Sequence, residues 1–272
     1  MAGSTVIMTG ASSGIGRSAA ALLASLGARL ILVGRSPEKY RPVQAELDEL
    51  GASHGLVAAE LGDLSSVAAA AHQLADRADG HGEVILINNA ATAGRRGVTR
   101  DGFELAFGVN YVASYLLSSI LLQGRLPIST VINVTSNAHY STPRLDLDLA
   151  IGKTRSLSGW REYSHSKAAQ AAFTIELAER SPAVRSLAVH PGVVATRLWR
   201  RIPQPFRFFA TRRMASPDAG ALPVVRAATD LALLSGGYLG PEGLKVPSPA
   251  VLDVTARRRL WHASRQWVEP FL

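Results

Sequence analysis

The sequence contains no cysteine, which excludes a disulfide framework, a thiolate nucleophile and a cysteine-ligated zinc site. It also contains no uninterrupted apolar run of the roughly 18 residues that a membrane-spanning helix requires. No signal peptide precedes the first motif. From these absences we expect a cytoplasmic protein with no membrane span and no metal centre.

Lysine is scarce, since the net charge of +8 comes from 25 Arg and only 4 Lys against 21 acidic residues. A basic balance can indicate a nucleic acid, an anionic surface or an acidic partner. An Arg-rich, Ala-rich composition also follows from a GC-rich genome, and most of these arginines are scattered. No recognition fold accompanies the charge, so we expect no nucleic-acid partner.

Hydrophobic residues make up 47% of the 272 residues, enough for a sizeable core. Six apolar runs are predicted strands: Thr5–Thr9, Arg29–Val33, Gly55–Ala59, Val84–Asn88, Thr130–Thr135 and Val184–His190. Helical patterns lie near 15–26, 37–50, 65–78, 101–124, 163–180 and 217–234. Nearly continuous apolar strands are typical of a parallel sheet that is covered on both faces. The alternation predicts a doubly wound α/β fold, and no linker or repeat divides residues 1–272 into separate domains.

A glycine-rich turn joins the first strand to the first helix. Its candidate dinucleotide-binding residues are Gly10, Ser12, Ser13, Gly14, Ile15 and Gly16. Glycine lets the backbone turn tightly and approach a ligand, and a helix N-terminus offers N–H groups to a pyrophosphate. Glycine-rich turns without a ligand are common, but the strand before and the helix after this turn are the context that a dinucleotide site requires.

The end of the second strand bears on which dinucleotide binds. NAD-binding chains usually carry Asp or Glu there, for the ribose hydroxyls. This strand ends in Leu32-Val33-Gly34-Arg35, and the planar guanidinium of Arg35 can bind a 2′-phosphate in bidentate fashion. The alternative is a solvated arginine in a turn. The sequence favours NADP(H) as the cofactor.

Further short motifs follow the later strands in order. They are Asp63-Leu64, Asn88-Asn89-Ala90-Ala91, Asn110 within Phe107–Tyr111, Ser136, Tyr163-Ser164-His165-Ser166-Lys167 and His190–Thr196. Together with the glycine turn, this series resembles the short-chain dehydrogenase/reductase family from residue 5 to about 240. The resemblance implies a single-domain Rossmann fold with a doubly wound parallel sheet of about seven strands flanked by helices. Ala91 stands where the family's NNAG motif has glycine, a mild departure.

The resemblance also implies roles for individual residues. The implied catalytic set is Asn110, Ser136, Tyr163 and Lys167. The implied cofactor-binding residues beyond the glycine turn and Arg35 are Asp63 and Leu64 at the adenine, Asn89 and Ala90, and Pro191, Gly192, Val194 and Thr196 at the nicotinamide amide. Tyr163 and Lys167 would contact the cofactor as well, Lys167 at the nicotinamide ribose, and Asn110 would hold a water that links Lys167 to solvent.

The residue types themselves account for the chemistry at Tyr163. Tyr163 and Lys167 are four apart and so share one face of a helix. A phenol with a pKa of ~10 is a poor acid at neutral pH, and an adjacent ammonium is expected to lower that pKa. Tyr163 could then exchange a proton with a carbonyl or an alcohol, while Ser136 holds the same oxygen. No Gly-x-Ser-x-Gly elbow supports a hydrolase, so His165 is interpreted as a helix-surface residue.

The 27 positions from Ser136 to Tyr163 include an insertion at 137–162. Its Asn137-Ala138-His139-Tyr140 and Leu145–Leu149 segments resemble the retinol-dehydrogenase-like branch of the family, whose bacterial members include ketoreductases of polyketide and anthracycline side chains. The resemblance implies an NADPH-dependent carbonyl reductase, or the reverse alcohol dehydrogenase, acting on a lipophilic ketone or aldehyde in secondary metabolism. The alternatives are a non-catalytic NADP-binding regulator and a related lyase or epimerase.

A segment at 197–215 is predicted to form a lid over the substrate. It carries four aromatic residues and six arginines: Trp199, Phe206, Phe208 and Phe209, with Arg197, Arg200, Arg201, Arg207, Arg212 and Arg213. The aromatics suit a large apolar substrate. The arginines are either solvated or meet an acidic carrier protein or an anionic membrane surface. Arg257–Trp261 is predicted to be one face of a terminal helix, and monomer and homodimer both stay open.

Overall fold

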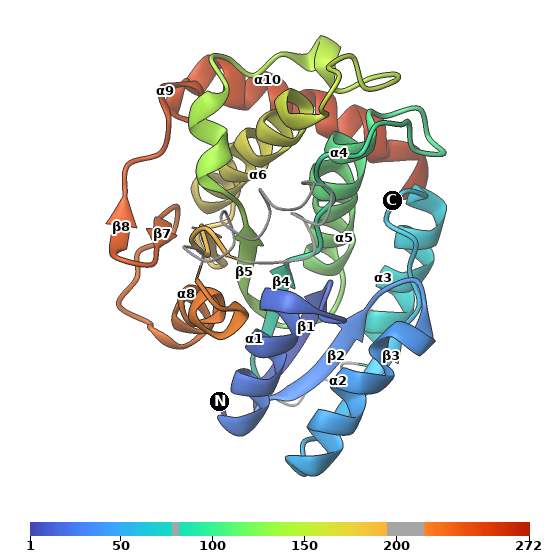
Figure 1. The fold of residues 1–272 in the computed structure, drawn as a ribbon, viewed down its shortest axis with the longest axis vertical. Helices are drawn as coiled ribbons and strands as arrows, with labels where there is room; N and C mark the ends of the chain where they lie inside the picture. The colour runs from blue at the N-terminus through green and yellow to red at the C-terminus, as the bar shows by residue number, and fades with distance from the viewer. Residues whose placement is uncertain (78–81, 195–214) are drawn as a thin grey trace, which may run out of the picture.

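The computed structural model describes residues 1–77, 82–194 and 215–272. Its centre is an eight-stranded sheet with the order β3-β2-β1-β4-β5-β6-β7-β8 (Figure 1). The strands are β1 (Thr5–Thr9), β2 (Arg29–Val33), β3 (His54–Val57), β4 (Val84–Asn88), β5 (Ile128–Val134), β6 (Arg185–Val189), β7 (Tyr238–Gly240) and β8 (Gly243–Lys245). All neighbours pair in parallel except β7 and β8. The predicted doubly wound α/β fold is confirmed.

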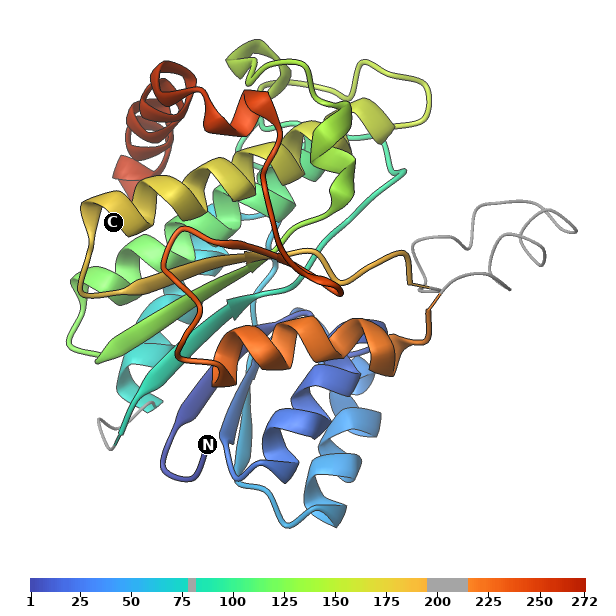
Figure 2. The same ribbon diagram turned by 90° about the vertical axis from the view of Figure 1, so that its left-hand side faces the viewer.

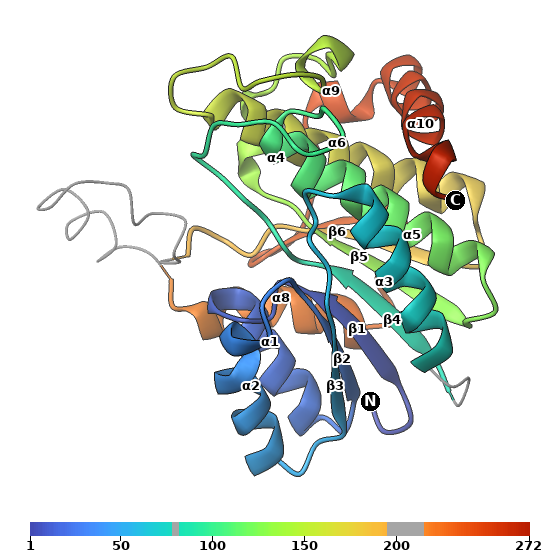
Figure 3. The same cartoon turned by 90° about the vertical axis from the view of Figure 1, so that its right-hand side faces the viewer.

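Helices cover both faces of the sheet, as Figures 2 and 3 show. They are α1 (Gly14–Ser25), α2 (Pro37–Glu49), α3 (Leu64–Arg77), α4 (Leu105–Phe107), α5 (Ala113–Gln123), α6 (Trp160–Arg180), α8 (Pro217–Thr229), α9 (Pro249–Leu252) and α10 (Val254–Val268). Helices α1, α2 and α8 pack on one face, and α3, α5 and α6 pack on the other. The two faces of the sheet bury separate apolar clusters, which explains the unbroken apolar strands.

The predicted strands β1, β2 and β4 match the structure residue for residue, and the other three differ by one or two residues at each end. The sheet has eight strands rather than about seven. The sequence analysis did not identify β7 and β8, because strands of three residues are too short to show a periodic pattern. They form a hairpin in which Gly243 has a φ of +127°, a conformation that residues with a Cβ rarely adopt.

One helical stretch among the described residues, Leu105–Gln123, is long and apolar enough to span a membrane by composition alone. Its mean hydropathy is 1.6, although Ser, Asn and Gln interrupt the apolar run. In the fold, 78% of that window is buried inside the protein. The stretch contacts α3 and α6 and lies against the sheet, as a core helix does.

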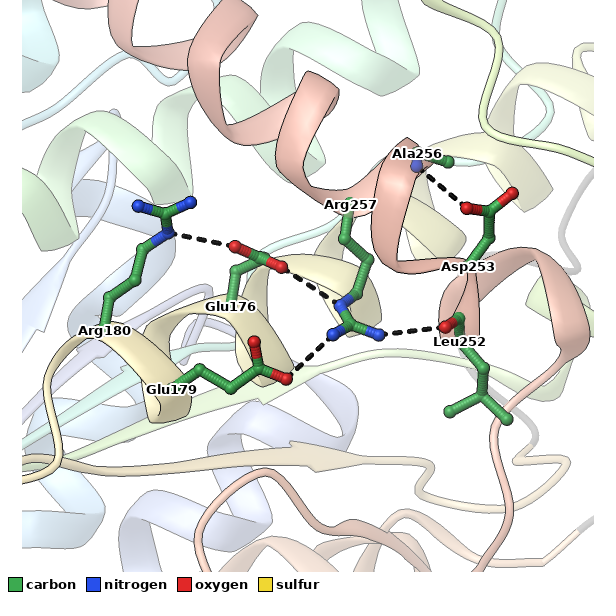
Figure 4. Close-up of polar contacts among 7 residues, drawn as sticks. All are labelled: Glu176, Glu179, Arg180, Leu252, Asp253, Ala256 and Arg257. Atoms are coloured by element: carbon green, nitrogen blue, oxygen red, sulfur yellow. Dashed lines mark hydrogen bonds and ion pairs between the residues drawn. The ribbon is translucent and has the colours of Figure 1, made fainter.

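The terminal helix α10 packs on the outside of α6 (Figure 2). Arg257, expected on one face of that helix, is only 4% exposed. Its guanidinium donates to Glu176 at 3.2 Å, to Glu179 at 2.8 Å and to the carbonyl of Leu252 at 3.0 Å (Figure 4). Because Glu176 and Glu179 belong to α6 and each of the three guanidinium nitrogens makes a hydrogen bond, this network attaches the C-terminal segment firmly to α6.

Candidate active site

A cavity of about 500 Å³ opens at the carboxyl edge of the sheet, near the point where the strand order reverses between β1 and β4. Ligands of doubly wound sheets bind at this place. The predicted site residues that line the cavity are Gly10, Ser12, Ser13, Gly14, Ile15, Gly16, Arg35, Asn89, Ala90, Tyr163, Lys167 and Pro191. The fold therefore brings the glycine turn and the Tyr–Lys pair, more than 140 residues apart, to one cavity.

The glycine turn leaves no room for side chains at two of its positions. A Cβ on Gly10, whose φ is +73°, would lie 2.6 Å from the Cα of Ala90. A Cβ on Gly16 would lie 2.4 Å from the carbonyl oxygen of Gly10. The amide of Asn89 donates to the carbonyl oxygens of Thr9 and Gly10 at 3.0 and 3.1 Å and so holds the turn against β4. The result is a rigid cradle of backbone at the N-terminus of α1, suited to a pyrophosphate.

The far end of the cavity, beyond the carboxyl ends of β2 and β3, carries exposed charges. Arg35 donates to Glu60 at 3.2 Å, and the two side chains are 54% and 47% exposed. Lys39, at the start of α2, also lines the cavity. The sequence analysis missed Lys39 and Glu60. Two cations and one carboxylate therefore surround the position predicted for the 2′-phosphate.

Asp63 and Leu64, expected at the adenine, do not line the cavity. The carboxylate of Asp63 accepts from the backbone N–H groups of Ser65 and Ser66 at 3.1 and 3.3 Å, at the N-terminus of α3. It also pairs with Arg100 at 2.6 Å, and the Arg100 guanidinium lowers the pKa of Asp63. Asp63 acts as a helix cap.

The acidic–leucine pair that does line the cavity is Glu60-Leu61, three residues earlier. The amphipathic run that follows Asp63 is the sequence signal that distinguishes the two pairs, because a short acidic residue directly before such a run is typical of a helix cap.

The reacting end is buried. Tyr163 is 5% exposed, and its ring centroid lies 5.8 Å from Nζ of Lys167. Burial raises the pKa of Tyr163, and a hydrogen bond with the side chain of Ser136 acts in the opposite direction. The expected lowering by Lys167 is not found in this structure. Burial dominates at Tyr163, and it also reduces the charge on its lysine neighbour.

Lys167 is 1% exposed, and burial lowers its pKa to about 7. Its Nζ donates to the carbonyl oxygen of Val134 at 2.8 Å and to Oε1 of Gln170 at 2.7 Å. Both partners are neutral. The protonation of Lys167 beside Tyr163 therefore depends on its burial and on hydrogen bonds to two neutral oxygens.

Asn110 lies in a π-helical turn, Gly108–Val112, between α4 and α5. Its Oδ1 accepts from the N–H of Thr92 at 2.7 Å, and its Nδ2 donates to the carbonyl of Thr92 at 3.0 Å and to Ser166 at 2.9 Å. Such turns often mark functional sites. The Asn110 side chain therefore joins the loop after β4 to α6 beside the Tyr–Lys pair. The water that the resemblance assigns to Asn110 stays a prediction.

Ser136, directly after β5, is held by a buried histidine. Its carbonyl lies 2.7 Å from Nδ1 of His139, and Nε2 of His139 accepts the N–H of Ser248 at 3.1 Å. Since the Ser248 amide can only donate, Nδ1 carries the proton. Burial lowers the pKa of His139, which favours this neutral form. His139 therefore attaches the backbone of Ser136 to the segment that precedes α9.

His165 was interpreted as a surface residue, and this was wrong: it is 1% exposed. Its ring stacks on Phe107 at 5.1 Å, and its Nε2 accepts the N–H of Asp146 at 3.0 Å. Burial lowers its pKa to about 4. The polar sequence Ser164-His165-Ser166 suggests an exposed face, but the 137–162 insertion covers this part of α6.

Two buried carboxylates hold that insertion in place. Glu104 contacts the hydroxyl of Thr154 at 2.5 Å, and Glu162 accepts from the N–H of Ser156 at 2.8 Å. Trp160, at the end of the insertion, lies with its ring 5.3 Å from that of Tyr163 and is 41% exposed. An aromatic surface therefore lies next to the candidate acid.

The loop after β6 is described only in part. Pro191 lines the cavity, whereas Gly192 and Val194 do not, and Val194 forms a β-bridge with Ala215. Thr196 lies outside the described residues, and so do residues 197–214 of the predicted lid 197–215, which carry its aromatics and arginines.

Comparison with known proteins places these observations in context. Residues 4–145 match the family model described as short chain dehydrogenase. A Streptomyces sp. (strain C5) protein described as a daunorubicin C-13 ketoreductase is 36% identical over 96% of this chain and 91% of its own. Human retinol dehydrogenase 13 is 34% identical over 98% of this chain and 85% of its own.

Two solved structures show the same fold. An uncharacterised protein from Mycobacterium paratuberculosis has a TM-score of 0.77 at 31% identity, covering 97% of this chain and 93% of its own. A Beutenbergia cavernae protein, described as an NAD(P)-dependent gluconate 5-dehydrogenase with NADP bound at low occupancy, has a TM-score of 0.69 at 26% identity, covering 89% and 96%.

Proposed function

Because the chain belongs to the short-chain dehydrogenase family, an oxidoreductase family of carbonyl and alcohol groups, we propose that it is an NADPH-dependent carbonyl reductase for lipophilic ketones or aldehydes. The observation that carries the proposal is the single cavity that is lined by the glycine cradle and by Tyr163 and Lys167. A protein that only sensed a dinucleotide would not need an acid–base tyrosine beside it.

The residues present fit a dinucleotide, since side chains are sterically excluded at Gly10 and Gly16, where the backbone would meet a pyrophosphate. Support for NADPH over NADH comes from the absence of a carboxylate at the end of β2 and from Arg35 and Lys39 at the cavity. Glu60 weakens this preference, because it already neutralises part of the charge on Arg35. NADPH, when bound, would supply the hydride.

The chain's own residues would handle the proton. Ser136 follows β5 and lies close enough to Tyr163 to lower its pKa against the effect of burial, and in the proposed reaction both hydroxyls bind the substrate oxygen. Tyr163 would donate its proton to that oxygen as the carbonyl carbon receives the hydride, so the carbonyl would become an alcohol and the tyrosine a phenolate. The ammonium of Lys167 stabilises the phenolate until a proton from solvent restores the tyrosine.

The proposed substrate class rests on Trp160 beside Tyr163 and on the relatives, whose names mention daunorubicin and retinol. The test is NADPH oxidation with a panel of aromatic and long-chain ketones, with acetone-sized ketones and NADH as controls. Net oxidation that is faster with bulky ketones and with NADPH supports the proposal. Tight NADPH binding without net oxidation would instead indicate a regulator, and substrate conversion without net oxidation a lyase or an epimerase.

A further inference from the structure

Gln170 is a buried amide that the proposed reaction does not yet use. It lies one turn after Lys167 on α6 and is 0% exposed. Its Oε1 accepts from Nζ of Lys167 at 2.7 Å, and Nζ also donates to the carbonyl oxygen of Val134 at 2.8 Å. An ammonium has three donors and no acceptor, so the amide must turn its oxygen toward Lys167. Two neutral oxygens therefore hold the charge of this lysine.

Turning the amide oxygen of Gln170 toward Lys167 leaves the amide nitrogen in an unfavourable environment. Among the described residues, Nε2 of Gln170 is buried and has no hydrogen-bond partner. An unpaired buried donor is unfavourable, and an apolar side chain of the same length would avoid the penalty. The benefit of a glutamine at this position therefore lies on the Lys167 side.

Gln170 is itself fixed in place by the layer beneath it. Its backbone carbonyl accepts from the hydroxyl of Thr174 at 2.9 Å, and Thr174 accepts from the amide of Asn133 on β5 at 3.0 Å. Asn133 in turn accepts from Asn88 on β4 at 3.0 Å. This polar row attaches the backbone of α6 at Gln170 to two central strands and so fixes the position from which the Gln170 side chain reaches Lys167.

We propose that Gln170 is a positioning residue that keeps Lys167 protonated and aligned with Tyr163, without cancelling the positive charge that the phenolate of Tyr163 needs. This role rests on the proposed function. A carboxylate at position 170 would also favour the ammonium, but it would offset the charge on Lys167. An amide oxygen stabilises the ammonium and leaves its full charge directed at Tyr163.

The groups around Lys167 make its titration simple to follow. Tyr163, on the same helix, is the titratable side chain that faces it, while β5 contributes the neutral carbonyl of Val134. Burial is the sole cause identified for the lowered pKa of Lys167. Within the described part of the chain, no carboxylate competes with Gln170 for the ammonium.

The direct test uses the scarcity of lysine. With only four lysines in the chain, selective isotope labelling should give four resolvable side-chain NMR signals, and Lys167→Met identifies the signal of Lys167. Gln170→Met, which keeps the length but removes the acceptor, should lower the pKa of Lys167 by roughly one unit, and Gln170→Glu should raise it by as much or more. Ser264→Ala, which removes a buried hydrogen bond to Tyr111 and touches neither Lys167 nor Gln170, is the matched control and should leave that pKa unchanged.

The kinetic test follows the alkaline limb of kcat/KM for ketone reduction. The pH at which kcat/KM begins to fall on the alkaline side should be lower in Gln170→Met and higher in Gln170→Glu than in the wild type. The substitutions should change kcat more than KM. A merely structural role would not move the limb in opposite directions. Equal Lys167 pKa values in the wild type and both variants would overturn the proposal. If the two variants shift the pKa of Lys167 in opposite directions but the protein reduces no ketone, the role of Gln170 in stabilising the Lys167 ammonium is confirmed. The proposed function is then contradicted instead.

Discussion

The two ends of the cavity use charge in opposite ways. At the adenosine end, Arg35 and Glu60 are about half exposed and pair with each other. At the reacting end, Lys167 and Tyr163 are buried and meet neutral partners. Exposed charges are screened and individually weak, whereas a buried charge is sensitive to each neighbouring hydrogen bond. Substitutions at the exposed end should therefore tune cofactor choice, and substitutions at the buried end should change the chemistry itself.

The largest expected effect is at the buried end. Tyr163→Phe removes the proton donor while keeping the ring that packs against Trp160, so kcat for ketone reduction should fall by ~10²-fold or more. The dissociation constant for NADPH, measured by fluorescence titration, should change little. Near-normal turnover in this variant would remove Tyr163 from the catalytic role.

At the exposed end, Arg35→Ala should weaken NADPH binding by ~10–100-fold, because a charge-assisted bidentate contact contributes roughly 1.5–3 kcal/mol. NADH binding should be nearly unaffected. Arg100→Ala is a suitable control, since Arg100 pairs with Asp63 and does not line the cavity. If Arg35→Ala weakened the binding of NADPH and NADH equally, Arg35 would not bind the 2′-phosphate.

Acid should destabilise the buried end specifically. Burial lowers the pKa of His165 to about 4, and an unfolded histidine titrates near 6.5. The unfolded chain therefore binds more protons between these values, and the stability due to neutral His165 is present above pH ~6.5 and is lost as the pH falls toward 4. The loss is about 1.4 kcal/mol per pH unit.

Urea unfolding of the wild type and of His165→Gln at pH 7.5 and 5 measures this effect. The variant should lose less stability than the wild type on acidification. His72→Gln is the control, because His72 is exposed. An identical pH dependence in the wild type and His165→Gln would contradict the buried neutral histidine.

The smallest expected effect concerns the pair at the adenosine end. Glu60→Gln frees Arg35 from a carboxylate, and exposed ion pairs contribute only ~0.2–1 kcal/mol. NADPH binding should tighten by roughly 2- to 5-fold at low salt, and the gain should shrink as salt is added. Unchanged or weaker NADPH binding would show that Glu60 does not compete for Arg35.

Motifs whose spacing specifies a backbone could be predicted from the sequence, and features that depend on tertiary burial could not. The doubly wound sheet and the convergence of the glycine turn with Tyr163 and Lys167 follow from strand periodicity and motif order. Asp63 was misplaced because two acidic–leucine pairs occur three residues apart. His165 looks like a surface residue in sequence, and the insertion over α6 makes it internal. Gln170 is also polar, but it is buried on the side of α6 that meets Lys167 and β5.

The isotope experiment that tests the central claim most directly uses NADPH carrying deuterium at the transferable position of the nicotinamide, together with a bulky aromatic ketone. Mass spectrometry of the product should find one deuterium at the carbinol carbon for each NADPH consumed, and Tyr163→Phe should slow its appearance by ~10²-fold or more. Saturable binding of NADPH with no deuterium in any product from the ketone panel would contradict the assignment as a carbonyl reductase.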